Sequence, residues 1–304
     1  MNLDFAAYKK IENAIGIEDY ADSIIHYSSL ETLESLLQSN ELWMGHISSM
    51  NDTTECSHFL SGIEPAFRDL FDPRTLAQFW PYVEKARNRI MTDTFVSSWC
   101  EYSDDEQDGS LYMWQEYGNG GQGIGIIVDS SRFQPSSLTP QKINFFVTNS
   151  KVKYIPQNTA ASYAEELSRK VYKSISNLDE AGRLFATAMM IIASAPTIKH
   201  PSFAHEKEIR FLFLDPIPDF RPMKKFMSVT ETAAGGSLRP YAQLQLRDYP
   251  EYGFDLSPSK ILKAILVGPG KDQNQRAQKV YDLLGTNGLE HVEVIRSRIP
   301  YTKR

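Results

Sequence analysis

The stretch HEKEIRFLF, residues 205–213, predicts a β-strand whose two faces differ in polarity. Apolar side chains recur there with period two, as in a strand with one face in a core: Ile209, Phe211 and Phe213. The other face then carries two carboxylates and a guanidinium: Glu206, Glu208 and Arg210. Such a row is commonly the solvated side of a sheet. It also suits a cleft in which charge is used chemically, and the rest of the sequence must be weighed between these two interpretations.

Composition predicts a globular protein that does not bind nucleic acid through its overall charge. The chain has 304 residues, 41% of them hydrophobic and 12% aromatic, which is enough for one large core or a core with an inserted lobe. The net charge of −6 gives no global attraction to nucleic acid, so such a substrate would need a local patch. The two cysteines, Cys56 and Cys100, are too few for a disulfide framework and indicate a reducing compartment.

Neither a signal peptide nor a membrane span is expected. Residues 1–16 carry acids early and contain no apolar run. The most apolar stretch, residues 184–195, is far shorter than the ~20 residues that a spanning helix needs. We therefore expect a cytoplasmic protein without a membrane partner.

The order of expected elements predicts an α+β protein. Strands are expected near 23–27 and 94–102, with a helix between them that begins at a Ser28/Glu31 capping box and stops at Asn40. Two further regions are expected to be helical. The first spans about 62–93, with breaks at Asp72-Pro73 and Trp80-Pro81. The second is an insertion at about 157–199, and the sequence from Ala264 to Ser297 then predicts strand, helix and strand. The prediction is one domain, 1–304, built on a mixed sheet with flanking helices.

Familiar catalytic and metal-binding signatures are missing. The sequence has no G-x-S-x-G, Walker A, H-E-x-x-H or paired C-x-x-C motif, so no metal is expected. The segment GNGGQG precedes a strand, whereas a dinucleotide fingerprint follows one, so a turn or a closely approached backbone fits it better. The GPG at 268–270 is weak evidence for phosphate binding, and Cys100 is interpreted as a buried small hydrophobe.

A series of short motifs resembles a widespread bacterial family catalogued as a domain of unknown function. The resemblance extends from about residue 24 to residue 301. In chain order the motifs are IHYSSLETLESLLQSNELWMG, MNDTTE, VSSWCE, LYMWQEYGNGGQGIGI, EKEIRFLF, RPYAQL, ILVGPG and RSRIPY.

That family in turn resembles the ADP-ribosyltransferase fold, a split mixed sheet that holds NAD in a central cleft. The resemblance implies a histidine on an early strand, hydroxyl residues on another strand, an aromatic residue on a short helix and a catalytic glutamate on a later strand. Matched position by position, His26 takes the first role and Glu208 the last, with Glu206 as the leading acid of an E-x-E pair. Ser97 and Ser98 match the second strand. Three residues match the aromatic: Tyr112, Trp114 and Tyr117.

The resemblance also implies the chemistry, with NAD as a substrate. Loss of nicotinamide passes through an oxocarbenium-like ribose, which a carboxylate on the ribose 2′-hydroxyl stabilises. Glu208 would supply that carboxylate from an accessible cleft, so that Glu208→Gln abolishes transfer and leaves folding intact, and Glu206 would orient the acceptor. Arg210 would bind a phosphate or pair with an acid. The expected NAD-contacting residues are His26, Tyr27, Ser97, Ser98, Trp114, Tyr117 and Arg210.

The sequence leaves alternatives open. The ADP-ribose acceptor would be a protein, RNA or DNA, and families of this kind often serve as toxins or phage-defence effectors, which implies an antitoxin protein as a partner. One rival function is a non-catalytic nucleotide- or protein-binding module of the same fold, with Glu208 and Arg210 in a surface salt bridge. A second rival is a metal-dependent nuclease that would use four acids: Asp52, Glu55, Glu206 and Glu208.

Overall fold

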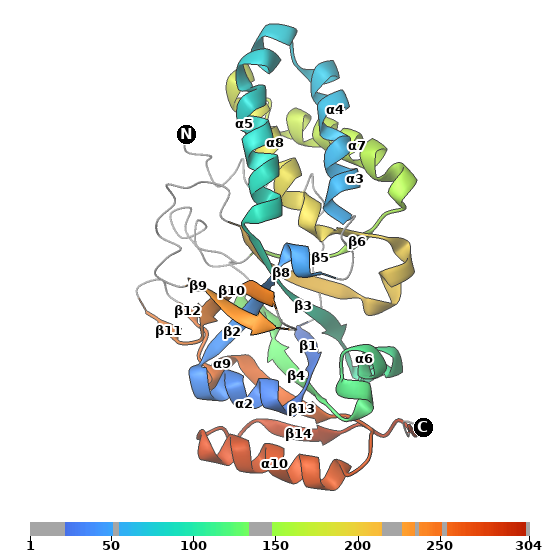
Figure 1. The fold of residues 1–304 in the computed structure, drawn as a ribbon, viewed down its shortest axis with the longest axis vertical. Coiled ribbons are helices and arrows are strands. Elements are labelled where there is room, and N and C mark those ends of the chain that lie inside the picture. The colour runs from blue at the N-terminus through green and yellow to red at the C-terminus, as the bar shows by residue number, and fades with distance from the viewer. Residues whose placement is uncertain are drawn as a thin grey trace.

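A computed structural model shows a mixed α+β protein (Figure 1). It describes residues 22–50, 55–133, 148–214, 227–234, 237–250 and 254–301. The helices are α2 (Leu30–Ser39), α3 (Glu55–Ser61), α4 (Ile63–Leu70), α5 (Pro73–Thr92), α6 (Leu111–Glu116), α7 (Ala160–Ser174), α8 (Glu180–Ser194), α9 (Pro258–Ile261) and α10 (Gln273–Thr286). In the part of the chain that is described, no helix has the length and apolar character to cross a membrane.

The strands form one large mixed sheet and two small ones. They are β1 (Ser23–Ser28), β2 (Glu41–His46), β3 (Thr94–Tyr102), β4 (Ile124–Asp129), β5 (Thr148–Lys151), β6 (Lys153–Tyr154), β7 (Ile198–Lys199), β8 (Glu208–Leu214), β9 (Met227–Ala234), β10 (Ser237–Gln245), β11 (Asp248–Tyr249), β12 (Phe254–Asp255), β13 (Leu262–Val267) and β14 (Glu293–Arg296). The large sheet has the order β14-β13-β4-β1-β3-β2-β10-β9, and β8 pairs with β3 and β5. Strands β13 and β14 are parallel, joined by α10, whereas β1, β3, β4 and β8 pair antiparallel. The expected α+β class with a mixed sheet is confirmed.

The large sheet divides along β3. On one side, β3 pairs with β8 from residue 94 to residue 100. On the other side, β1 pairs only with residues 100–102, and β2 pairs only with residues 95 and 96. Among the described residues, residues 97–99 of β3 therefore have no strand partner on that side, and β1 and β2 diverge there. We call this place the split.

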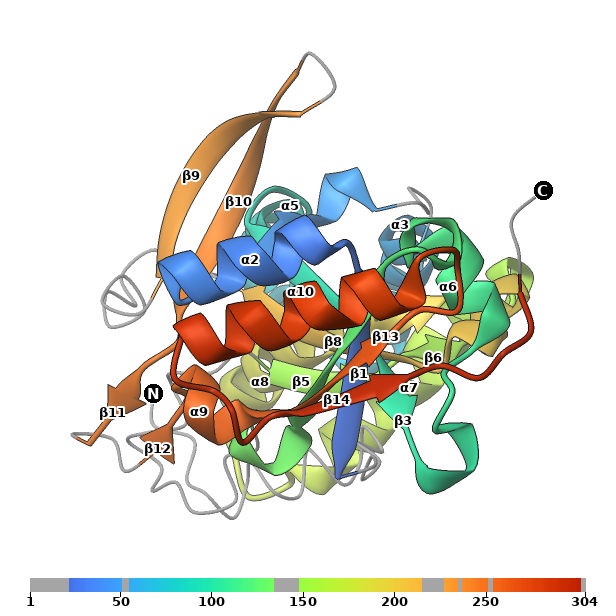
Figure 2. The same cartoon turned by 90° about the horizontal axis from the view of Figure 1, so that it is seen from below.

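Helices cover both faces of the sheet near the split. α2 and α10 lie side by side over one face (Figures 1 and 2) and contribute to one core with Ile24, Phe211 and other buried strand residues. On the opposite face, α6 packs Met113 and Trp114 against Ile25. Successive residues of β1 thus enter different cores, because side chains alternate along a strand.

A helical lobe, formed by α3, α4, α5, α7 and α8, stands on the sheet at the end opposite α10 (Figure 1). Helices α7 and α8 lie between β6 and β7, in the region where the insertion at about 157–199 was expected. They share one core with α3–α5, from the earlier helical region. The lobe is therefore assembled from two segments that are distant in sequence. Their contact is close at Gly62, where an added Cβ would lie 2.1 Å from the carbonyl oxygen of Ala161.

Several local expectations hold and two are wrong. The expected break at Asp72-Pro73 is present, since α4 ends at Leu70 and Asp72 caps α5, and Asn40 ends α2 as expected. The N-cap of α2 is Ser29, which accepts from the amide of Thr32, rather than Ser28. The break at the second proline of α5 is also wrong, since the helix continues through Pro81 to residue 92. Packing of α5 in the lobe core outweighs the loss of one backbone donor.

The glycine-rich segments GNGGQG and GPG pack against each other. The amides of Gly268 and Gly270 donate to the carbonyls of Gly123 and Gly121 at 3.0 and 2.7 Å. A Cβ on Gly121 would lie 2.8 Å from the ring of Tyr301. These positions lack a side chain because the two backbone segments contact each other directly, so the glycines do not indicate a phosphate site.

The close contact at Gly62 generates a stability prediction. Gly62→Ala should lower the free energy of unfolding by about 1–3 kcal/mol, because the Cβ would collide with backbone atoms of α7 that cannot move independently. Gly285→Ala is the control. That position in α10 has no atom within 4 Å of an added Cβ, so alanine should be neutral or stabilise by up to about 1 kcal/mol. Urea unfolding measures both, and equal effects would contradict the close packing of the two halves of the lobe.

Candidate active site

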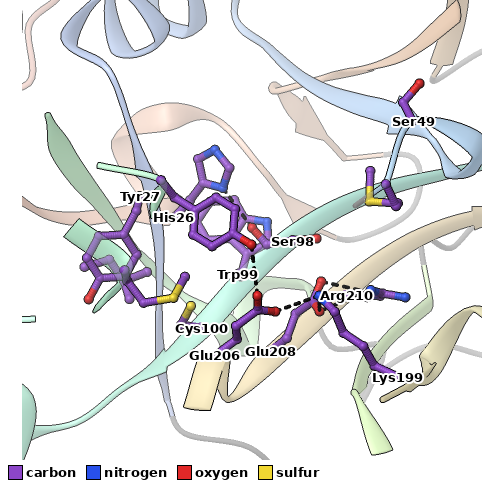
Figure 3. A pocket seen from close by; sticks show the side chains of 14 residues that line it. His26, Tyr27, Ser49, Ser98, Trp99, Cys100, Lys199, Glu206, Glu208 and Arg210 are labelled. Carbon is purple, nitrogen blue, oxygen red and sulfur yellow. Dashed lines mark hydrogen bonds and ion pairs between the residues drawn. The ribbon is translucent and has the colours of Figure 1, made fainter. Parts of the chain in front are cut away.

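A hollow of about 210 Å³ opens at the split (Figure 3). We call it the first hollow. Its lining comes from β1, β3, α6, β7 and β8 and from the 3-10 helix η8 (Pro201–Glu206). The polar residues facing it include His26, Ser98, Tyr117, Lys199, Glu206, Glu208 and Arg210.

Glu208 begins β8 and is bound by two cations. Nε and Nη2 of Arg210 donate to Oε1 and Oε2 of Glu208 at 2.9 and 3.2 Å. Nζ of Lys199 donates to Oε2 at 3.0 Å. Arg210 is held from its far side as well, because its Nη1 donates to the carbonyl of Pro196 at 2.6 Å. Glu208 and Arg210 are 4% and 1% exposed, so both charges are removed from solvent.

Glu206 reaches the same cluster by a different backbone route. It is the last residue of η8 and not part of β8, since Lys207 turns through the left-handed region at φ 45° before the strand starts. The prediction that Glu206 shares one strand face with Glu208 and Arg210 is therefore wrong for Glu206, which lies outside the strand. The Glu206 carboxylate nevertheless accepts from Nζ of Lys199 at 2.7 Å and from the hydroxyl of Tyr117 at 2.9 Å.

The charged face of β8 is buried, so neither a solvated sheet face nor a surface salt bridge describes it. Leu212 on that face enters the core of the helical lobe. Ile209, Phe211 and Phe213 fill the core beneath the opposite face, as the period-two pattern predicted. Glu208 faces the first hollow but lies deeper than the accessible cleft position that the sequence led us to expect.

The two cations decide the ionisation of Glu208. Burial raises the pKa of this carboxyl, but Arg210 and Lys199 outweigh burial and lower the pKa from 4.5 to about 2. Burial likewise lowers the pKa of Lys199, but Glu208 and Glu206 together outweigh burial, so the net direction is upward. Both groups are therefore ionised at neutral pH.

His26 occupies the edge of the split on β1. Its Nδ1 lies 2.8 Å from the carbonyl oxygen of Ser98, which can only accept, so Nδ1 carries the proton. Burial lowers the pKa of His26 below 6.5, and the bond to Ser98 only partly opposes this effect. The ring is therefore neutral at pH 7, and Nε2 carries a lone pair. The indole of Trp99 lies beside it, with ring centroids 5.2 Å apart.

The two serines of β3 point to opposite faces of the sheet. Ser98 lines the first hollow, and its side chain contributes to the lowered pKa of Glu208. The hydroxyl of Ser97 instead accepts from Nε1 of Trp99 at 3.0 Å, and Ser97 does not line the hollow. Of the two candidates, Ser98 is placed to contact a ligand and Ser97 holds Trp99 in position.

The aromatic candidates are separated by their burial. Tyr117 lines the first hollow. Trp114 is fully buried in the core under α6, where its Nε1 donates to the carbonyl of Asp108 at 3.0 Å, so the ring is not available to stack on a ligand. Tyr112 packs edge-on against His205. Tyr27 lines the hollow, but its hydroxyl is occupied by accepting from the amide of Ser110.

Sequence analysis missed three parts of this arrangement. Lys199, in the two-residue strand β7, bridges both carboxylates, and no periodicity or motif marks a single lysine after an apolar helix. Trp99 lines the first hollow and also a second hollow of about 320 Å³ against α2 and β2. Cys100 also lines the first hollow, and burial, with Glu208 and Glu206 nearby, raises the pKa of its thiol, so it stays protonated.

The proposed nuclease site is not assembled in the described residues. These hold no group of three or more His, Cys, Asp or Glu side chains arranged to bind a metal ion. Glu206 and Glu208 accept from Lys199 and Arg210 instead. Asp52 lies outside the described residues, and Glu55 begins α3.

The lowered pKa of Glu208 generates a prediction on stability and pH. A carboxyl whose pKa falls on folding contributes stability that is complete above its ordinary pKa of 4.5 and is lost as pH falls toward about 2. At pH 7, Glu208→Gln should therefore cost about 3–5 kcal/mol, because it leaves buried cations short of a partner. Below pH 4.5 the wild type should lose stability more steeply than the variant.

Urea unfolding between pH 7 and pH 2 measures this difference. Glu290→Gln changes an exposed glutamate that does not line the first hollow; it is the matched control and should follow the wild type throughout. Parallel pH curves for wild type and Glu208→Gln would show that the ion cluster does not stabilise the fold.

Comparison with known proteins gives one match. A family described as "Protein of unknown function (DUF2971)" matches residues 113–211. No curated protein and no solved structure matches the chain. The matched span runs from α6 through most of β8 and contains Tyr117, Lys199, Glu206, Glu208 and Arg210. Over the segment that supplies the buried charges, the chain is thus similar to a family whose function is not assigned.

Proposed function

We propose that this protein cleaves NAD at the first hollow and transfers ADP-ribose to a macromolecular acceptor, in the manner of an ADP-ribosyltransferase. One observation carries the proposal. The neutral His26 of β1, Ser98 of β3, Tyr117 after α6 and the paired carboxylates at 206 and 208 line a single hollow where the sheet divides. The resemblance inferred from the sequence assigns the histidine, a serine, an aromatic and the glutamates to one NAD site.

The chemistry needs a negative charge near ribose and a neutral acceptor on its hydroxyls. Breaking the bond between ribose C1′ and the nicotinamide nitrogen leaves the electron pair on nicotinamide and positive charge on the sugar. A carboxylate in a water-poor hollow stabilises that charge as it develops. A nucleophile on the acceptor then bonds to C1′ and releases its proton. Nε2 of His26 can accept a ribose hydroxyl because the ring is neutral.

The two hollows suit an extended ligand. Pockets for small molecules commonly measure about 300–1,000 Å³, and the first hollow, at about 210 Å³, is large enough for only one end of a dinucleotide. His26 and Trp99 also line the second hollow, of about 320 Å³. We place the nicotinamide end in the first hollow and the remainder of NAD beyond His26.

One observation favours the alternative of a non-catalytic nucleotide-binding module. Both oxygens of Glu208 are occupied by Arg210 and Lys199, an arrangement that also suits a purely structural ion cluster. In that case the chain would bind NAD without releasing nicotinamide. The acceptor, which the resemblance leaves as protein, RNA or DNA, and an antitoxin partner stay predictions of the sequence.

A turnover assay tests the proposal. The wild type should release nicotinamide from NAD, and His26→Ala should lower the rate by roughly 10- to 100-fold, the loss expected for one buried hydrogen bond. His291→Ala is the control, because His291 is exposed and hydrogen-bonds to the carbonyl of Ser259, away from the residues that line the first hollow. Chromatography of nicotinamide measures the rate, and calorimetry with NAD measures binding. Binding without turnover would support the binding module. The absence of both binding and turnover would refute both functions.

A further inference from the structure

The carboxylate of Glu208 is held by more donors than that of Glu206. An ionised carboxylate offers about four lone-pair positions. Glu208 receives two N–H groups of Arg210 and the ammonium of Lys199, so that Oε2 accepts twice and Oε1 accepts once. All of these donors are within the protein, and Arg210 is also tied to the carbonyl of Pro196. A ligand hydroxyl could reach Oε2 of Glu208 only by displacing a buried donor, and Oε1 lies against the guanidinium of Arg210.

Glu206 differs in this respect. Among the described residues it receives two donors, Lys199 on Oε2 and the Tyr117 hydroxyl on Oε1. Each oxygen therefore keeps one lone-pair position for a further donor. Glu206 is 3% exposed in the unliganded chain but lines the first hollow together with Tyr117. Its remaining acceptor capacity can serve a molecule bound in the hollow.

We propose that Glu206, and not Glu208, is the carboxylate that contacts the ligand. Glu208 is a positioning residue: with Arg210 it fixes Lys199, which in turn holds Glu206. This assignment rests on the proposed function, because it takes the ligand to be the ribosyl end of NAD. It reverses the roles that the E-x-E resemblance gives to the two acids.

The same contacts define the chemical class that the first hollow accepts. Among the described residues, acceptor positions remain on Glu206 and on Nε2 of neutral His26, whereas Lys199 and Arg210 donate to the carboxylates and to the carbonyl of Pro196. Such a lining binds hydroxyl groups beside a neutral or cationic ring and repels phosphate. The ligand for this hollow is therefore a ribosyl unit with its base, such as nicotinamide riboside, and the pyrophosphate of NAD lies outside it.

Three variants separate the roles of the two acids. The first is Glu206→Gln and the second is Glu208→Gln. The third combines Glu208→Leu with Arg210→Met, which removes both partners of the buried pair, a change that is often nearly neutral for stability. Each is compared with the wild type by thermal unfolding, by calorimetric titration with nicotinamide riboside and with inorganic pyrophosphate, and by nicotinamide release from NAD.

We expect Glu206→Gln to stay folded, to bind nicotinamide riboside at least tenfold more weakly and to release nicotinamide about 10²–10³-fold more slowly. Glu208→Gln should lower the melting temperature by roughly 6–20 °C. The double variant should recover at least half of that loss and bind the riboside within tenfold of the wild type. Pyrophosphate alone should not bind at the hollow.

The outcomes distinguish this assignment from the function on which it rests. A wild type that binds the riboside but releases no nicotinamide refutes the transferase, while weaker riboside binding in Glu206→Gln still supports the assignment. Turnover and riboside binding unchanged in Glu206→Gln refute the assignment alone. A double variant as unstable as Glu208→Gln, or folded but unable to bind, would show that Glu208 itself contacts the ligand or that Arg210 is not its structural partner.

Discussion

The structure depends on a buried cluster of two carboxylates and two cations. Removing any one member from water without its partners would cost several kcal/mol, whereas the four together carry no net charge and bind one another at 2.7–3.2 Å. The members come from η8, β7 and β8. Three segments must therefore be in place at once before the charges are neutralised. This requirement fixes the wall of the first hollow.

The divergence of β1 and β2 supplies the other wall. Among the described residues, neither strand pairs with the middle of β3, so the carbonyl of Ser98 has no strand partner on that side and accepts a hydrogen bond from Nδ1–H of His26 instead. The imidazole is thereby fixed in one tautomer with its acceptor nitrogen available. The break in sheet pairing thus provides both the space of the first hollow and the hydrogen bond that orients His26 beside it.

Sequence patterns predicted the helices and strands, and which residues lie together at the first hollow, better than they predicted the environment of each side chain. The alternation of Ile209, Phe211 and Phe213 identified β8 because a strand with one buried face leaves a period-two signature. The same alternation could not show that the charged face is also covered, since the helices covering it lie far away in sequence. Lys199 is only seven and nine residues from Glu206 and Glu208, but a single lysine in a two-residue strand forms no periodic pattern or motif. Trp114 and Tyr117 are three residues apart, and only tertiary packing separates the core residue from the one facing the hollow.

The composite origin of the helical lobe has a consequence for how this architecture can be altered. Neither the 55–92 segment nor the 160–194 segment buries its apolar face without the other, as the shared core and the contact at Gly62 show. Deleting either segment would expose the apolar face of the other to solvent. A protease cut between the helices of one segment should leave the fragments associated. The lobe therefore consists of two segments that fold against each other, and it cannot be grafted onto another scaffold as one contiguous piece of chain.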